Sequence, residues 1–186
     1  MQLGVLSGAL QSMRKAYFLP LLVLFSSICR LGLTLSFRNG RTAGITLPSS
    51  GAQERVIRKA LEKGDIHPNE ITYVECHGTG TKVGDAIEVD ALSSVFQRAS
   101  HHPLYIGSVK SNIGHSEAAS AISSVIKGVM AMERGQIPGT HGLRHINPTL
   151  RAEERHISIP KTLIPWPQSH NEVRRMGKNK HHQYVV

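Results

Sequence analysis

Two short segments of this 186-residue chain place a histidine among glycine and polar residues, and each follows a predicted strand. The first segment reads HGTGT over residues 77–81, and the second reads KSNIGH over residues 110–115. Strand ends are where α/β proteins keep their functional sites. Both segments are therefore candidates for chemistry, but each is weak alone, because a lone histidine is usually a surface or core residue.

The first segment is suited to hold an amide-bearing ligand. Gly78 and Gly80 would let a ligand approach the backbone closely. The hydroxyls of Thr79 and Thr81 can each donate and accept a hydrogen bond. A phosphate-cradling loop is the alternative for these residues, but the G-x-x-x-x-G-K-[ST] spacing of such loops is absent.

The second segment ends in a histidine that could donate a hydrogen bond. His115 follows Gly114 and immediately precedes a predicted helix, whose dipole disfavours the imidazolium form and keeps the ring neutral. A neutral ring can donate one hydrogen bond. His141 and His145 have the spacing of metal ligands only if they lie on a helix, and the glycine and prolines around them argue against one, so no metal site is expected.

Alternating helix and strand patterns position these segments, which predicts the α/β class. Ser50 and Gln53 read as a capping box, and Asp85 and Glu88 are expected to cap the second helix. The third helix is expected to bury an apolar face made of Ala121, Ile122, Val125, Ile126, Val129 and Met130. The expected order is a helix over 50–64, a strand over 71–75, a helix from about 85, a strand over 104–109, a helix over 116–134 and a short strand at 156–159.

The composition allows one modest domain and gives it a basic character. The chain has 22 Lys+Arg, 13 Asp+Glu and a net charge of +9, which suits anionic partners such as phosphorylated cofactors, acidic carrier proteins or nucleic acid. Part of this charge lies late in the chain and is also explained by a basic tail. Cys29 and Cys76 are the only cysteines and have no C-x-x-C spacing, so the sequence predicts a reducing, cytoplasmic setting.

The amino-terminal stretch is the least informative part of the sequence. Residues 17–29 read YFLPLLVLFSSIC and follow a basic pair. This run is short for a membrane span, and Pro20 and Arg30 interrupt it, so a membrane location is not expected. A secretory signal remains an alternative, but no convincing cleavage site follows.

Beyond these patterns, the chain resembles the β-ketoacyl synthases of polyketide-synthase type. The resemblance is carried by ITYVECHGTGTKVGDAIEVDAL over 71–92 and LYIGSVKSNIGHSEAASAISSVIKGVMAME over 104–133, in that order and spacing. The stretch over 39–61, NGRTAGITLPSSGAQERVIRKAL, resembles the part that precedes the first histidine motif in that family. The likeness covers roughly residues 39–167, which correspond to the carboxy-terminal half of the family domain.

This resemblance implies a thiolase-like fold and a decarboxylative Claisen condensation in polyketide or fatty-acid biosynthesis. The extender would be a malonyl-type thioester carried on the phosphopantetheine of an acyl carrier protein, with no cofactor bound directly to this chain. His77 and His115 match the two catalytic histidines of the family, and Lys110 matches the lysine that supports the second histidine. Thr79 and Thr81 match the positions that bind the pantetheine arm.

The sequence departs from the family at both ends. The nucleophile of the family lies in an Asp-Thr-Ala-Cys-Ser-Ser type motif upstream of the first histidine, and no such motif occurs here. Cys29 has unrelated neighbours, and Cys76 is expected to point away from His77 because the two are adjacent at a strand end. We therefore expect a truncated synthase, or an inaccurate gene model, that is inactive alone. Its expected parts are an unassigned segment over 1–37, the synthase domain over 38–167 and a disordered basic tail over 168–186.

Two other hypotheses about function remain open. The chain could be a non-catalytic pseudoenzyme or interaction subunit that pairs with a complete synthase or a complementing half, as a homodimer or a mixed assembly. It could also be a nucleic-acid-binding basic protein, but only the charge supports this, and aromatic residues make up 5% of the chain. No nucleic-acid partner is therefore expected.

Overall fold

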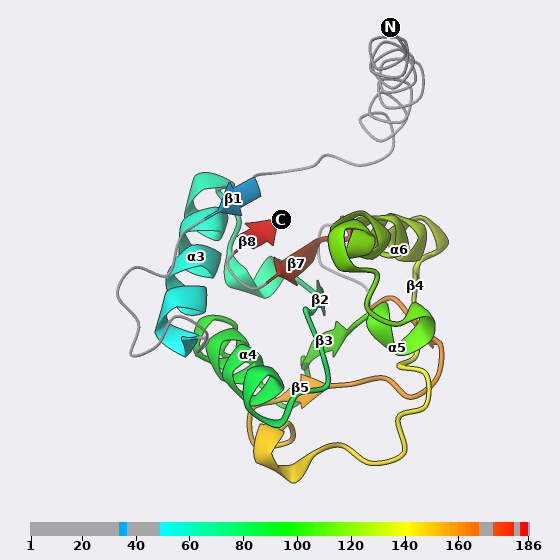
Figure 1. Cartoon of the computed structure of the whole chain (residues 1–186). Coiled ribbons are helices and arrows are strands. Elements are labelled where there is room, and N and C mark those ends of the chain that lie inside the picture. Colours follow the sequence, from blue (N-terminus) through cyan, green and yellow to red (C-terminus); the bar gives the residue numbers. More distant parts are fainter. Residues whose placement is uncertain (1–33, 37–48, 168–172, 181–182, 186) are drawn as a thin grey trace, which may run out of the picture. The chain divides into compact units, whose positions relative to one another are not determined.

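The computed structural model describes residues 34–36, 49–167, 173–180 and 183–185 (Figure 1). The described helices are α3 (Ser50–Lys63), α4 (Lys82–Val95), α5 (Lys110–Ile113) and α6 (Ser120–Arg134), with 3₁₀ turns η2 (Pro68–Glu70), η3 (Glu117–Ala119) and η4 (Pro148–Leu150). The described strands are β1 (Thr34–Ser36), β2 (Tyr73–Glu75), β3 (Leu104–Gly107), β4 (Gln136–Ile137), β5 (Ile157–Ser158), β6 (Ile164–Pro165), β7 (Met176–Lys180) and β8 (Gln183–Val185).

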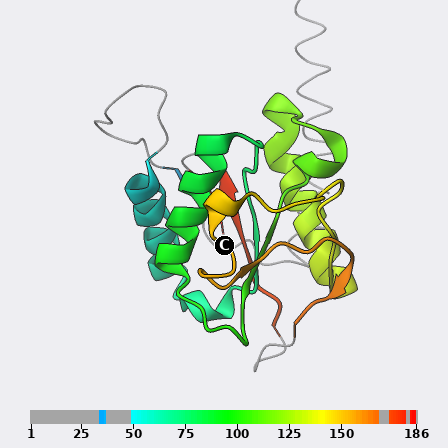
Figure 2. The same ribbon diagram turned by 90° about the horizontal axis from the view of Figure 1, so that it is seen from below.

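A six-stranded sheet, in the order β1-β8-β7-β2-β3-β5, forms the centre of this part of the chain. Strands β7, β2, β3 and β5 are parallel neighbours, whereas β8 pairs antiparallel with both β7 and β1. Helices α3 and α4 cover one face of the sheet and α6 covers the other, as Figures 1 and 2 show from two directions. The arrangement confirms the predicted α/β class.

Strand β2 is buried on both faces and joins two hydrophobic cores. Val74 packs with Leu92 and Ile106 in the larger core, between the sheet and helices α3 and α4. Tyr73 belongs to the smaller core on the α6 side, where its ring meets Trp166 edge to face with centroids 5.9 Å apart. The end of β2, where the first histidine motif begins, is therefore held from both sides.

The helices on the first face are capped earlier than the sequence predicted. The N-cap of α3 is Ser49, whose hydroxyl accepts from the Ala52 N–H, instead of the expected Ser50. The cap of α4 is Thr81 instead of Asp85, because the Thr81 hydroxyl accepts from the Gly84 N–H at 3.2 Å. Ser49 lies one position before the expected cap, whereas Thr81 lies four positions before Asp85, so α4 is capped about one turn earlier than predicted.

The predicted buried face of α6 is wrong. The helix packs on the sheet through its small residues Ser120, Ser124, Gly128 and Ala131, and a Cβ at Gly128 would collide with the Met176 side chain. The larger apolar residues Ile122, Ile126 and Met130 are 54%, 40% and 40% exposed. Small and large residues both recur at helical spacing along α6, so periodicity alone could not identify the face that approaches the sheet.

The expectation of a disordered tail from residue 168 is also wrong for part of the segment. Met176–Lys180 forms β7, which pairs parallel with β2, and β8 continues the sheet. Asn179 is buried, and its side chain donates to Gln53 at 3.2 Å and to Glu88 at 2.8 Å. These polar contacts fix a strand whose sequence, MGKNK, has no apolar alternation that could have predicted it.

The short strand expected at 156–159 is confirmed as β5, which pairs with β3. Most of the unassigned segment 1–37 lies outside the described residues, apart from β1. Within the described residues, none of the helices combines the length and apolar character that a bilayer span requires.

Candidate active site

His77 lies just beyond the end of β2, in a turn that two carboxylates hold from α4. Glu88 accepts from the backbone N–H of His77 at 2.7 Å and from that of Gly78 at 3.0 Å. Asp85 accepts from the Gly80 N–H at 3.2 Å. The helix that follows the motif therefore fixes the backbone of the motif itself, which sets the direction in which the His77 side chain leaves the turn.

Gly78 is required by the close approach of this turn to the end of β3. Its φ of 48° lies in the left-handed region, and a Cβ would come within 2.7 Å of the Ser108 Cβ. The Ser108 hydroxyl donates to the His77 carbonyl at 3.4 Å. The two strand ends that carry the histidine motifs are thus in direct contact.

Thr79 and Thr81 are both exposed on the outer side of the turn, and their hydroxyl oxygens are 3.5 Å apart. The Thr81 oxygen also accepts from Gly84 as the cap of α4, which leaves its proton able to donate to a ligand. The pair therefore offers two neighbouring hydroxyls to solvent beside His77.

The second motif begins at the end of β3. Lys110 is the first residue of α5 and is half-buried. Gly114 then turns the chain with a φ of 74°, and His115 follows with a side chain that is 38% exposed. The sequence predicted a helix directly after His115. In the structure η3 intervenes, and α6 starts at Ser120.

The contacts of His115 define which of its ring nitrogens carries a proton. Its Nδ1 accepts from the backbone N–H of Glu117 at 3.0 Å. An accepting nitrogen has no proton, so the neutral ring carries its proton on Nε2. His115 therefore has Nε2–H available as the hydrogen-bond donor that the sequence analysis expected.

The fold brings the two predicted histidines together. The rings of His77 and His115 are 5.8 Å apart between centroids and stand at 86° to each other. His77 lies two residues beyond β2, and His115 follows α5, which begins beyond the adjacent parallel strand β3. Two imidazoles at this distance can both approach one atom of a ligand that lies beside the pair.

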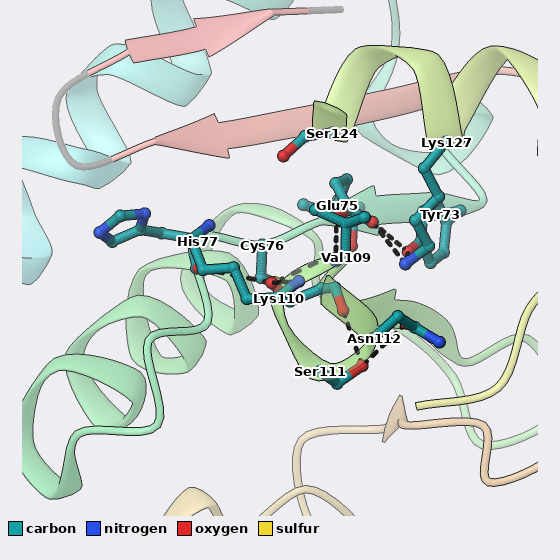
Figure 3. A network of polar contacts seen from close by, with 12 residues as sticks. Tyr73, Glu75, Cys76, His77, Val109, Lys110, Ser111, Asn112, Ser124 and Lys127 are labelled. Atoms are coloured by element: carbon teal, nitrogen blue, oxygen red, sulfur yellow. Dashed lines mark hydrogen bonds and ion pairs between the residues drawn. The ribbon is translucent and has the colours of Figure 1, made fainter. Parts of the chain in front are cut away.

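Beneath the site lies a buried ionic network that the sequence analysis missed. Glu75 is fully buried, and its Oε2 accepts from Lys127 Nζ at 2.8 Å and from the Tyr73 hydroxyl at 2.5 Å (Figure 3). Its Oε1 accepts from the Val109 N–H at 2.5 Å. Burial and the neighbouring Glu75 raise the pKa of Tyr73 well above its ordinary value of 10.0, so the phenol stays a donor. A glutamate inside an otherwise apolar strand was the available sequence signal.

Glu88 and Asn179 form a second buried polar contact that sequence reasoning did not assign. Burial raises the pKa of Glu88 above its ordinary value of 4.5, although hydrogen bonds from Gly78, His77 and Asn179 act in the opposite direction. Burial likewise raises the pKa of Asp85. The turn that holds His77 is therefore fixed by two carboxylates whose burial disfavours their charged forms.

Cys76 does not offer a substitute nucleophile. Its side chain is 6% exposed and lies in the larger core. Burial first, and then the nearby Glu88, Glu75 and Asp85, raises the pKa of its thiol well above the ordinary value of 9.0. The thiol is therefore held in its protonated, weakly nucleophilic form, as expected for a residue that faces away from His77.

A pocket of about 580 Å³ opens beside this site, between α5, α6 and the β4–β6 ribbon. Much of its lining is apolar and includes Ile113, Ile126 and Met130, and Lys127 contributes to its wall. Ile113 and Leu163, which also line it, are 59% and 58% exposed. The apolar face of α6 is thus part of a larger uncovered apolar surface.

In the described part of the chain, no group of three or more His, Cys, Asp or Glu side chains could hold a metal ion. His141 and His145 lie in an exposed loop and not on a helix.

Comparison with known proteins identifies the family. Residues 31–144 match the family described as beta-ketoacyl synthase, C-terminal domain. A highly reducing polyketide synthase of Penicillium roqueforti is 66% identical over 141 residues, which cover 76% of this chain and 7% of that protein. A highly reducing polyketide synthase of Neurospora crassa is 53% identical over 146 residues, covering 76% of this chain and 6% of that protein.

Solved structures agree with the sequence relatives. The ketosynthase from module 6 of the bacillaene synthase from Bacillus subtilis aligns with a TM-score of 0.75 and 35% identity, covering 83% of this chain and 29% of that chain. The ketosynthase from module 1 of the bacillaene synthase from Bacillus amyloliquefaciens gives 0.74 and 31%, covering 83% and 28%. This chain therefore spans less than a third of these ketosynthases and less than a tenth of the two polyketide synthases. The chain belongs to the β-ketoacyl synthase family, represents its carboxy-terminal domain, and has the α/β, thiolase-like fold of that family.

Proposed function

We propose that this chain supplies the histidine half of a β-ketoacyl synthase active site, in which an acyl thioester condenses with a malonyl-type extender. The observation that supports this proposal is the proximity of His77 and His115, whose ring centroids are 5.8 Å apart. Family membership supports the proposed reaction class, and the geometry supports the choice of these two residues.

In the proposed reaction, the carbon–carbon bond between the extender and its carboxylate breaks and releases carbon dioxide. The electron pair of that bond moves into an enolate, whose charge develops on the thioester oxygen. Donors from His77 and His115 stabilise that oxygen where the charge appears, which lowers the barrier. The enolate carbon then attacks the acyl thioester, forms the new carbon–carbon bond and displaces the cysteine thiolate that carried the acyl group.

His115 is suited to this role because its donor is fixed. The Glu117 N–H occupies Nδ1, so Nε2–H is left for the ligand. Lys110 begins α5, five residues before His115, and its proposed role is to support His115 electrostatically.

The extender is proposed to arrive on the phosphopantetheine arm of an acyl carrier protein. Thr79 and Thr81 offer two exposed hydroxyls beside His77, and these can bind the amides of the arm. The net charge of +9 favours an acidic carrier protein as partner. No cofactor other than this carried arm is required.

The cysteine that holds the acyl group has to come from outside the described site. The buried, protonated Cys76 cannot serve, and the Asp-Thr-Ala-Cys-Ser-Ser type motif is absent from the sequence. We therefore expect no chain extension by this chain alone. The second candidate function is that of a non-catalytic interaction subunit, and the exposed apolar face of α6 is the observation that favours it.

The test is decarboxylation of a malonyl-pantetheine thioester, which needs the histidines but not the cysteine. His77→Gln and His115→Gln are each compared with the unchanged chain, and His145→Gln, in an exposed loop, is the matched control. Each active-site change should lower the rate by roughly 10²–10³-fold, the usual cost of losing one oxyanion donor. Absence of decarboxylation by the unchanged chain, or equal rates in all variants, would favour the interaction subunit.

A further inference from the structure

Glu75 lies close in sequence to His77 and has three hydrogen-bond partners, but the proposed reaction assigns it no task. Glu75 ends β2 two residues before His77, and its side chain has no exposed surface. A fully buried carboxylate is costly unless paired and hydrogen-bonded. The contacts that stabilise Glu75 therefore indicate what it does.

The two oxygens of Glu75 face two different parts of the site. Oε2 receives Lys127 Nζ at 2.8 Å and the Tyr73 hydroxyl at 2.5 Å, and Lys127 also donates to that hydroxyl at 2.9 Å. Oε1 receives the Val109 N–H at 2.5 Å. One oxygen therefore joins β2 to α6, and the other joins β2 to the backbone that leads into α5.

These joined elements are the ones that carry both histidines. His77 follows β2, Val109 precedes Lys110 on the segment that leads to His115, and α6 follows His115. The Gly107 backbone also accepts from the Cys76 N–H at 2.7 Å, so the two strand ends are already in register. Past the strand ends, the Glu75 carboxylate adds a second contact to the one from the Ser108 hydroxyl to the His77 carbonyl.

We propose that Glu75 is a positioning residue, which holds the segment from Val109 to His115 against the end of β2 and so sets the separation of the two histidine rings. Lys127 supplies the counter-charge that allows the carboxylate to be buried in this position. The inference rests on the proposed function only for the task of the histidines, since the positioning itself is a property of the fold.

The Glu75→Gln substitution separates the positioning role of this side chain from its charge. It has one oxygen, for which the Lys127 ammonium and the Val109 N–H compete, and the ammonium is the stronger donor. In Glu75→Gln the Val109 N–H therefore faces an amide N–H₂ and loses its acceptor. In Glu75→Gln with Lys127→Met the ammonium is gone, so the oxygen is free to accept from Val109 again while the amide donates to Tyr73.

The experiment is hydrogen–deuterium exchange followed by mass spectrometry on the full chain at low micromolar concentration. Glu75→Gln should speed exchange in the peptide that covers residues 109–116 by about tenfold, with no equal change in α3 or α4, because one local hydrogen bond is lost. Adding Lys127→Met should restore the slow exchange. Glu154→Gln, which breaks an exposed ion pair with Arg151, is the matched control and should change neither region.

The proposal is overturned if Glu75→Gln leaves residues 109–116 unchanged, if exchange rises uniformly along the chain, or if the double variant exchanges as fast as the single one. Should Glu75→Gln show no cooperative melt, the double variant is compared with Tyr73→Phe/Glu75→Leu/Lys127→Met, which removes the whole network. Faster exchange of 109–116 in the triple variant alone then supports the proposal, and equal exchange overturns it. Because the readout needs no catalysis, failure of the proposed function leaves this test unaffected.

Discussion

At the scale of single residues, several of the proposed site residues also have a structural task. Thr81 is proposed to bind the pantetheine arm, and it also caps α4. His115 is a candidate donor, and its second nitrogen accepts from the backbone. Substitutions at such residues alter stability and binding together. Each prediction therefore needs a control substitution that separates the two effects.

Thr81→Ala should lower the free energy of unfolding by about 1 kcal/mol, because the Gly84 N–H loses its capping acceptor. Thr79→Ala should leave stability nearly unchanged, since Thr79 caps no helix, while both variants weaken binding of a pantetheine thioester. Urea denaturation and a binding titration measure the two effects. Thr81→Ser, which retains the hydroxyl, is the matched control, and a Thr81→Ala variant as stable as the unchanged chain would contradict the capping role.

The raised pKa of Glu88 predicts how the stability of the folded chain changes with pH. Burial raises its pKa above the ordinary value of 4.5, so the folded chain takes up the proton at a higher pH than the unfolded chain does. The contribution of Glu88 is then most favourable below 4.5 and is lost as the pH rises through the folded pKa. Relative to Glu88→Gln, the unchanged chain should gain stability as the pH falls from neutral towards 4.5. Urea denaturation across this range tests the sign, and a relative loss on acidification would contradict it.

At the scale of secondary-structure elements, α6 shows what the sequence could and could not predict. The apolar period identified the helix and its end near Arg134, but the inner face was wrong because small residues allow closer packing on the sheet. The strand ends and the histidine motifs were predictable, since glycine and threonine after a short apolar run are typical of α/β sites. Strand β7 was not predictable, because its place depends on Asn179 reaching Glu88, a contact between distant parts of the chain.

The exposed face of α6 should make the isolated chain self-associate. Ile122 and Ile126 expose apolar surface to solvent, and burying such surface is favourable. Ile122→Gln/Ile126→Gln should therefore reduce association in sedimentation velocity without lowering the melting temperature. Val83→Gln, an equally exposed apolar residue on α4, is the control and should not reduce association. A monomeric unchanged chain at tens of micromolar would contradict this prediction.

At the scale of the whole molecule, the chain corresponds to about three tenths of a ketosynthase, and the proposed site residues follow the ends of β2 and β3. The pocket between α5 and α6 is lined by Val109, Asn112 and Ile113, which belong to the segment that leads to His115. We expect the interaction that covers this surface to bring the acylated cysteine towards His77 and His115. Catalysis and assembly would then depend on the same face.

The most direct measurement is a complementation assay of chain extension. The chain is mixed with the separately produced upstream portion of the related Penicillium roqueforti ketosynthase region, an acyl thioester and malonyl carrier protein, and the β-ketoacyl product is measured by mass spectrometry. We predict product only from the mixture, with loss of product when His77→Gln or His115→Gln replaces the unchanged chain. A mixture that assembles but forms no product, or forms it equally well with either histidine variant, would contradict the proposal that this chain supplies the histidine half of the active site.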